Sequence, residues 1–407
     1  VNALAAALAV GLVIAVGRRF YDVRTGLLAG GLLALSPFFV LQSGSLLSHV
    51  VSLCWTMLLV LLFDIARSRE ARWAAVGAGA AAGALLLTRP LTAVGIGLAF
   101  AVIGLADLRR GRPLVRRYAL MLAGGLPFAL LLLAYNDATT GSPLRFAYEL
   151  WWDYDRIGFG PDNGINGHSL GDAIDNTRSN LDDLSEVLFG WPWRLSLGPA
   201  VIAAGVAAWR VWRRGLTRAT SADLQLAGMV VGLIAIHMLY WTPGKMYGPR
   251  YYFEIIGALS LLSARGLVWI WDVAGRALAR LERPGQAVRF VAPAVLALLV
   301  IYNLRVTLPD EADRYRGWNG VTRADLERLE EEDLDNALVF VPRPNWQFYA
   351  PMFLANSTEL DGDVVYAVDR GDDDNPTLMR DFPDRSYYRY TNGRLVPLSL
   401  PDAVGYG

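Results

Sequence analysis

Residues 1–49 read VNALAAALAVGLVIAVGRRFYDVRTGLLAGGLLALSPFFVLQSGSLLSH, and this stretch decides the fold class. Two apolar runs, at about 1–16 and 26–42, are separated by the short connector GRRFYDVR, which carries three arginines. Each run approaches the roughly 17–25 residues that a helix needs to cross the hydrocarbon core of a bilayer. The pattern predicts two membrane-spanning helices joined on the side where basic residues collect.

The same pattern continues to about residue 305 and predicts about ten spans. The composition agrees, because 54% of the 407 residues are hydrophobic and the mean hydropathy is +0.31, above what soluble domains usually show. Small residues in runs such as AAVGAGAAAGALLL would let neighbouring helices approach closely. The apolar runs lie at about 1–16, 26–42, 48–65, 73–88, 91–106, 118–135, 195–209, 222–241, 253–271 and 288–304.

The connectors between these runs alternate in charge. About nineteen arginines fall in GRRFYDVR, ARSREARW, DLRRGRPLVRRY, WRVWRRGLTR and GRALARLERPGQAVR, which the positive-inside rule places in the cytoplasm. The intervening connectors carry about seven basic residues over a greater length. These are residues 43–47, the turn at 88–90, a long segment at about 137–193 and the loop 241–254, and they are expected outside.

The composition changes after residue 305, where the hydropathy falls. TRADLERLEEED predicts a helix capped by Thr322, and LVFV and VVYAV predict short strands. We therefore expect a transmembrane domain at 1–305, with its outer loop at about 137–193, and a small soluble α/β domain at 306–407 on the outer face. The predicted fold class is a mainly α, polytopic membrane protein with a small C-terminal α/β extracytoplasmic domain.

The outer loop WTPGKMYGPRYYFE, residues 241–254, holds Lys245, the only lysine of the chain. Glycines and prolines would hold Lys245 and Arg250 at the membrane surface, where a planar fork and a compact charge could clamp a phosphate or diphosphate. Tyr251 is a candidate for the same carrier-phosphate site and could also stack on a sugar ring. The alternative is an ordinary aromatic belt with two cations that reach the headgroups.

Two further residues of the outer side are candidates. LLLTRPLTA places Arg89 at the end of two closely joined spans, where a charge is costly unless it is paired or reaches water. Arg89 is therefore a second phosphate-binding candidate, or an arginine that contacts lipid headgroups. His49, in SLLSHVV, is a candidate for sugar or acceptor binding, or else a hydrogen-bonded structural residue.

The long outer segment carries a mixture of residues that suits sugars. Trp152, Asp153 and Asp155 would offer an apolar ring face beside carboxylates that accept hydrogen bonds from hydroxyl groups. Loops also concentrate such residues without any function.

Several classes of function are disfavoured. The formal net charge of zero gives no basic field for nucleic acid, and three histidines with one cysteine predict no metal cluster, although a divalent metal stays open. The chain has no GxSxG, Walker or HExxH motif.

Four stretches together resemble a known superfamily. The first 49 residues, AGALLLTRPLTA, YNDATTGSPL and YGPRYYFE are similar to the polytopic GT-C glycosyltransferases of the protein-mannosyltransferase and aminoarabinose-transferase type. The resemblance covers most of residues 1–305 in order and does not extend to the tail.

The resemblance implies a transferase of the cell envelope. The arginine-rich, lysine-poor composition suggests a bacterial source, for which an inner membrane is expected. The transferase would move a sugar from a polyprenyl-phosphate carrier to a hydroxyl acceptor, a glycan, lipid or protein, at the extracytoplasmic face. The family's catalytic acid lies between its first and second spans, and the first span here matches the second. The acid is therefore expected upstream of Val1, and this chain alone is expected to be inactive.

Two other classes stay open on the sequence alone. A transporter or flippase for a lipid-linked or small solute would place ionisable residues near the bilayer midplane, where only His237 and Arg265 are candidates. A membrane anchor that presents the C-terminal domain would need fewer than ten spans.

Overall fold

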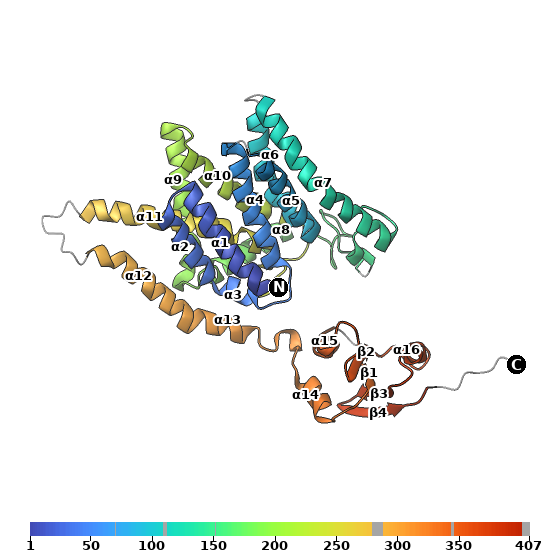
Figure 1. Ribbon diagram of the computed structural model, residues 1–407. Coiled ribbons are helices and arrows are strands. Elements are labelled where there is room, and N and C mark those ends of the chain that lie inside the picture. The colour runs from blue at the N-terminus through green and yellow to red at the C-terminus, as the bar shows by residue number, and fades with distance from the viewer. Residues whose placement is uncertain (70, 109–111, 151, 279–287, 343–345, 401–407) are drawn as a thin grey trace. The chain divides into compact units, whose positions relative to one another are not determined.

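The computed structural model describes residues 1–69, 71–108, 112–150, 152–278, 288–342 and 346–400, and these form two compact units that divide between Glu311 and Ala312 (Figure 1). Parts of three arginine-rich connectors, residue 70 and residues 109–111 and 279–287, lie outside the described residues. The helices of the larger unit are α1 Asn2–Phe20, α2 Val23–Ala34, α3 Pro37–Ser43, α4 His49–Arg69, α5 Arg72–Thr88, α6 Pro90–Leu108, α7 Arg112–Thr140, α8 Leu170–Val187, α9 Gly198–Arg214, α10 Arg218–His237, α11 Ile256–Leu278 and α12 Val288–Tyr302. The division between the units falls within the short helix α13, Leu308–Arg314.

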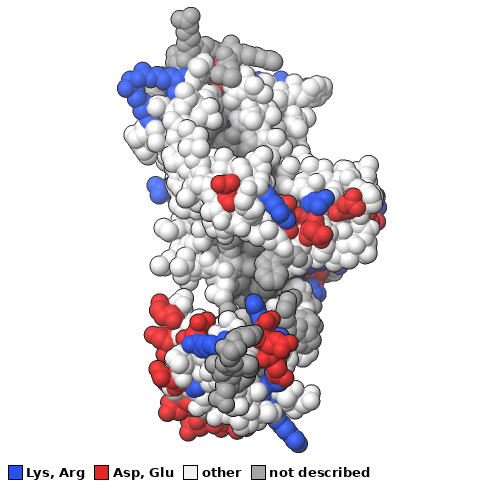
Figure 2. All heavy atoms as spheres, turned by 90° about the vertical axis from the view of Figure 1, so that its right-hand side faces the viewer, with Lys and Arg blue, Asp and Glu red and all other residues white. Residues whose placement is uncertain are grey.

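The predicted mainly α, polytopic membrane fold with a small C-terminal α/β domain is confirmed, because each apolar stretch named above coincides largely with a helix or a bent pair of helices. Within the described ranges, eight helices are long and apolar enough to cross a membrane. The bent pair α2–α3 would make a ninth span, and α5 is a shorter apolar helix of 17 residues. Much of the visible face of this unit carries no charged side chain (Figure 2).

The break between α2 and α3 has a local cause. Pro37 cannot donate a backbone hydrogen bond, and the preceding Ser36 has extended backbone angles, as residues before proline usually do. The Ser36 hydroxyl accepts a hydrogen bond from the backbone of Phe39 at 3.2 Å and so caps α3. The two helices meet at a bend of 61°.

Glycines allow α5 and α7 to pack closely. A Cβ added at Gly79 would lie 1.8 Å from the carbonyl oxygen of Met121, and one added at Gly124 would lie 2.2 Å from that of Val76. The two backbones therefore touch directly, as small residues permit between helices in membranes. This packing positions the α5–α6 junction, which carries Arg89.

The connector between α7 and α9 is partly helical. It contains the 3₁₀ turn η1, Ala147–Leu150, and the amphipathic helix α8, which begins with a capping box between Ser169 and Asp172. After α8, the 3₁₀ segment η2, Pro192–Leu197, leads into α9. A second 3₁₀ segment, η3, Arg250–Ile255, runs directly into α11.

The smaller unit is a mixed sheet with helices on both faces. Its strands are β1 Ala337–Val341, β2 Val364–Val368, β3 Ser386–Thr391 and β4 Arg394–Leu398, in the order β2-β1-β3-β4. The first three are parallel and β4 is antiparallel to β3. The helices α14 Ala324–Glu331 and α15 Trp346–Ala355 contribute to one core and α16 Asn375–Asp381 to the other.

The balanced net charge of the chain hides two opposite parts. Residues 312–407 hold 18 acidic and 10 basic residues, a net charge of −8, so residues 1–311 carry +8. Acidic side chains of the smaller unit appear as red patches in Figure 2. The basic charge of the helical unit belongs mainly to the arginine-rich connectors.

Replacing Gly79 by alanine tests the close contact of α5 with α7. The added methyl group meets backbone at 1.8 Å, so we expect the melting temperature in detergent to fall. Gly97→Ala in α6 is the control, because a Cβ there meets nothing within 4 Å and alanine favours a helix. Equal melting temperatures for the two variants would contradict the contact.

Candidate functional site

Helix α8 holds the loop 241–249 through a polar stripe. The side-chain amide of Asn176 donates to the carbonyl of Trp241, and that of Asn180 donates to the carbonyl of Pro243, both at 3.1 Å. One helical turn further, Asp183 lies 2.8 Å from Lys245. The stripe repeats every three to four residues, so it occupies one face of the helix.

The turn at the tip of this loop requires glycine. Gly244 has a φ of +63°, and a Cβ there would lie 2.0 Å from the ring of Tyr251. Tyr247 adopts a φ of 55° and Gly248 one of +118°, so three residues of this loop occupy the left-handed region. The tight path brings the ring of Tyr251 back against the loop.

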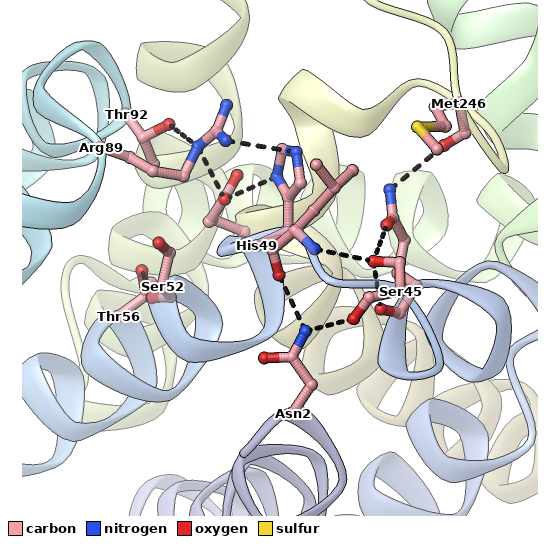
Figure 3. A network of polar contacts seen from close by, with 11 residues as sticks. Asn2, Ser45, His49, Ser52, Thr56, Arg89, Thr92 and Met246 are labelled. Atoms are coloured by element: carbon pink, nitrogen blue, oxygen red, sulfur yellow. Dashed lines mark hydrogen bonds and ion pairs between the residues drawn. The ribbon is translucent and has the colours of Figure 1, made fainter. Parts of the chain in front are cut away.

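A second turn leads into α4 and is fixed from both sides (Figure 3). The amide of Asn2 donates to the carbonyls of Ser45 and Leu47 at 2.6 and 2.9 Å. The amide of Gln42 donates to the carbonyl of Met246 at 3.1 Å, which ties this turn to the loop 241–249. His49, the first residue of α4, is therefore held beside that loop.

At the centre of the site lies Glu254, whose side chain is fully buried. Its Oε1 atom is 3.0 Å from Nδ1 of His49 and 3.2 Å from Nε of Arg89. A buried carboxylate is strongly unfavourable unless a cation and hydrogen bonds compensate it, and these two residues do so. Its second oxygen, Oε2, has no hydrogen-bond partner in the described part of the chain.

The contacts among Glu254, His49 and Arg89 determine which ring nitrogen of His49 carries the proton. Nη1 of Arg89 lies 3.2 Å from Nε2 of His49, and Figure 3 shows the two side chains pointing toward each other. A guanidinium only donates hydrogen bonds, so Nε2 must accept. The proton of His49 then sits on Nδ1 and is donated to Glu254, an assignment that follows from the hydrogen-bond network.

Both arginines of the site flank Tyr251. The guanidinium carbon of Arg89 is 5.8 Å from the ring centroid, and that of Arg250 is 5.1 Å from it. Nη2 of Arg250 also donates to the Tyr251 hydroxyl at 3.3 Å. The ring of His237 stacks on Tyr251 with centroids 5.3 Å apart. The structure thus brings Arg89 and Arg250 together at the ring of Tyr251.

Lys245 has a different environment from the two arginines. Its Nζ atom donates to the hydroxyl of Ser179 at 2.6 Å and pairs with Asp183, both on α8. The charge of Lys245 is therefore compensated by a carboxylate. No carboxylate contact of Arg250 occurs among the interactions of the described residues.

Asp155 joins the outer segment to the same aromatic group. Its Oδ1 atom accepts hydrogen bonds from the Tyr240 hydroxyl at 2.6 Å and from the indole of Trp241 at 2.7 Å. The ring of Tyr240 meets Tyr251 edge-on, with centroids 5.3 Å apart. Burial raises the pKa of the Tyr148 hydroxyl to about 12, and the negative charge of Asp155 contributes to this increase. Asp155 therefore lies one aromatic ring away from Tyr251.

The other two sugar-binding candidates lie elsewhere on the segment. The side chain of Trp152 is 51% exposed. The backbone carbonyl of Asp153 accepts a hydrogen bond from Arg156 at 2.8 Å. Within the described ranges, no side-chain hydrogen bond or ion pair links Trp152 or Asp153 to the Asp155 group. No set of three His, Cys, Asp or Glu side chains there is arranged to hold a metal ion.

The sequence reasoning missed Glu254, the residue around which the site is arranged. The sequence does contain an indication of its role, because an acidic residue at the start of an apolar run of a membrane protein needs a partner. It also missed His237 as a ring partner of Tyr251, and Tyr240 and Trp241 as donors to Asp155. Their roles depend on which loops meet, and that is a tertiary property.

Comparison with known proteins supports the architecture. The family model of a domain of unknown function, DUF7846, matches residues 337–399. No curated protein matches the chain in sequence. The crystal structure of ArnT from Cupriavidus metallidurans bound to undecaprenyl phosphate is similar over 95% of this chain and 78% of that one, with 15% identity and a TM-score of 0.52. The chain therefore has a GT-C-like, polytopic membrane fold.

A second solved structure is more distant. It is the Archaeoglobus fulgidus oligosaccharyltransferase in the apo form, with 14% identity and a TM-score of 0.43. The match covers 86% of this chain and about half, 51%, of that protein.

Removing the carboxylate of Glu254 tests its role in the network. Glu254→Ala leaves the guanidinium of Arg89 without its buried partner, which typically costs roughly 3–5 kcal/mol. We therefore expect a clear loss of thermal stability, and a smaller loss for Glu254→Gln, which still accepts a hydrogen bond. Asp153→Asn, at an exposed position, is the control. Melting curves for Glu254→Ala that match the control would contradict the buried pairing.

Proposed function

We propose that the chain is a membrane glycosyltransferase of the GT-C type, related in activity to protein-mannosyltransferases and aminoarabinose transferases. It moves a sugar from a polyprenyl-phosphate carrier to a hydroxyl acceptor at the extracytoplasmic face. The observation that carries this proposal is the pair of arginines, Arg89 and Arg250, that flank Tyr251 at the ends of several spans. The likeness to ArnT, a protein bound to undecaprenyl phosphate in its crystal structure, supports the same assignment.

The proposed reaction needs a cationic site for its leaving group. The bond between the sugar C1 atom and the carrier phosphate oxygen breaks, and a bond forms between C1 and the acceptor oxygen. The acceptor proton passes to a base, and the carrier departs as polyprenyl phosphate with additional negative charge. Fixed guanidinium groups stabilise this charge more strongly in the transition state than in the ground state. No base is assigned within this chain.

The geometry of Arg89 suits that task. Nε contacts Glu254 and Nη1 contacts His49, which fixes the plane of the guanidinium. In Figure 3 the other terminal nitrogen of Arg89 points away from His49. Because an arginine has five donor hydrogens in a rigid fork, the remaining ones can bind phosphate oxygens. Glu254 and His49 thus act as positioning residues for Arg89.

The other binding roles follow from the same arrangement. Arg250 supplies a second guanidinium, and Tyr251 supplies a hydroxyl beside it. Lys245 would join the phosphate contacts on leaving Asp183, which lies 2.8 Å away. Asp155 is the carboxylate best placed to accept hydrogen bonds from the sugar or the acceptor, because Tyr240 links it to Tyr251.

The positions of the remaining ionisable groups support a transferase over a transporter. His237 lies at the end of α10, against Tyr251. Arg265 lies 4.0 Å from Asp223 and over the ring of Tyr21, which belongs to an arginine-rich connector. His237 therefore lies at the end of a span. Arg265 lies in the middle of α11, but its side chain is paired with Asp223 and reaches Tyr21 at the end of α1.

Sugar transfer by the full-length protein tests the phosphate site. With polyprenyl-phosphate-linked sugar donors, we expect Arg250→Ala and Arg89→Ala each to lower turnover at least about tenfold, as loss of one charge-stabilising donor typically does. Lys245→Ala is expected to have an effect in the same direction. Arg178→Ala on α8, where the arginine side chain is 78% exposed, is the control. Near-normal turnover by folded Arg89 and Arg250 variants would refute the assignment.

Cysteine labelling tests which side of the membrane each segment faces. In a Cys54→Ser background, we expect Asp162→Cys and Asp363→Cys to react with an impermeant reagent added outside, and Arg214→Cys to react only after permeabilisation. Asp162 is preferable to Gly164, because Gly164 has a φ of +85° and a Cβ there would meet Trp241 at 2.7 Å. The opposite labelling pattern would invert the proposed topology.

A further inference from the structure

A cavity of about 350 Å³ lies at the arginine-rich end of the helical unit, away from the site described above. Along α4, its residue Asp64 is 15 positions after His49, a rise of roughly 22 Å. Along α10, its residue Arg218 begins the helix that ends at His237. The cavity is therefore separate from the Glu254 network. It is lined by Phe20, Asp64, Arg67, Ser68, Asp107, Arg218, Ser221, Ala222 and Gln225.

Part of the cavity wall is a closed ion pair. Nε and Nη2 of Arg67 donate to the two oxygens of Asp107 at 2.6 and 2.9 Å, and the hydroxyl of Tyr118 donates to the same carboxylate at 2.8 Å. The side chain of Asp107 is only 3% exposed. This bidentate pair holds α4 against α6 and forms a fixed wall.

Another part of the wall holds an arginine that can move. Asp64 accepts a hydrogen bond from Nε of Arg19 at 2.5 Å, and Nη2 of Arg218 lies 3.3 Å from the same oxygen. Arg218 is 60% exposed, whereas Arg19 is 15% exposed. Since Arg19 already compensates Asp64, Arg218 can turn toward a ligand without leaving a buried carboxylate unpaired.

Helix α10 directs polar groups at the cavity from one face. Arg218, Ser221 and Gln225 lie three and four residues apart, which places them on the same side of the helix. Gln225 is only 7% exposed, and its Nε2 atom has no hydrogen-bond partner among the described residues. Arg218 is also in the first turn of this 20-residue helix, where the backbone favours an anion.

We propose that this cavity binds a phosphate group, carried by an anionic lipid of the facing leaflet. The charged residues that line the cavity, Asp64, Asp107, Arg67 and Arg218, balance, and Arg19, which pairs with Asp64 from outside the lining, adds one positive charge. Arg218 supplies the charged donor, and Gln225 supplies an amide donor that is otherwise unpartnered. Basic pockets between spans at the cytoplasmic side bind anionic headgroups in this way. The proposal does not depend on the transferase activity.

Lipid binding to the purified full-length protein tests this proposal. The protein is placed in nanodiscs of phosphatidylcholine with or without phosphatidic acid, and retained lipid is counted by native mass spectrometry. Thermal unfolding at increasing phosphatidic acid gives the affinity. We expect Arg218→Glu to weaken phosphatidic acid binding at least about tenfold, the usual effect of losing a charged hydrogen bond. Arg218→Gln and Gln225→Leu are expected to weaken it less.

Arg213→Glu is the matched control, because it makes the same change of charge as Arg218→Glu. Arg213 is exposed in the last turn of α9 and does not line the cavity. Retention by this variant, together with loss in the Arg218 and Gln225 variants, supports the site. A stabilisation by inorganic phosphate or glycerol phosphate in lipid-free detergent, lost in Arg218→Glu, would assign the site to a free phosphate. Equal binding by all variants, or equal loss in Arg213→Glu, would overturn the proposal.

Discussion

The buried carboxylate of Glu254 is the constraint on which the end of the helical unit that carries the loop 241–249 depends. In a low-dielectric interior a carboxylate without compensation is so unfavourable that its partners must occupy fixed places. Arg89 arrives from the α5–α6 junction, His49 from the start of α4, and Glu254 from the segment η3 that leads into α11. One carboxylate oxygen thus ties together three parts of the chain that are up to 205 residues apart.

This constraint also has a chemical consequence. The close packing of α5 on α7 at their glycines helps to position the α5–α6 junction. The turn at Gly244 lets the ring of Tyr251 pack against the loop. With the junction and Tyr251 in place, the guanidinium of Arg89 contacts Glu254 and His49 and also lies against the ring of Tyr251. A cation held in this way needs little reorganisation when negative charge develops beside it.

The fold could be read from the sequence because its signals are local. Apolar length and the distribution of arginine act segment by segment, so all ten stretches were located before the packing was known. The strands at 337–341 and 364–368 were likewise visible as short β-branched and aromatic runs. The polar composition of residues 170–187 predicts a loop, but the structure has the helix α8 there. Its capping box, formed by Ser169 and Asp172, is the local signal for this helix.

The candidate site was only partly readable for the opposite reason. Residue type and membrane depth select Arg89, Arg250 and Tyr251, and both arginines lie against the ring of Tyr251. The contact of Lys245 with Asp183 could not be foreseen, because it requires α8 to pack on the loop 241–249. The partners of Glu254 likewise come from two distant turns, so no sequence window contains the network.

The two ends of the helical unit show that the number of arginines does not by itself define an anion site. At the arginine-rich end, Asp64 and Asp107 accept from three arginines, so most of the charge is used to hold α1, α4, α6 and α10 together. At the end that carries the loop 241–249 there are fewer cations, but Arg250 has no carboxylate contact among those described, and Glu254 offsets only one of two guanidinium groups. A phosphate responds to uncompensated donors and not to their total, so each end has one excess cation for an anion although their numbers of arginines differ.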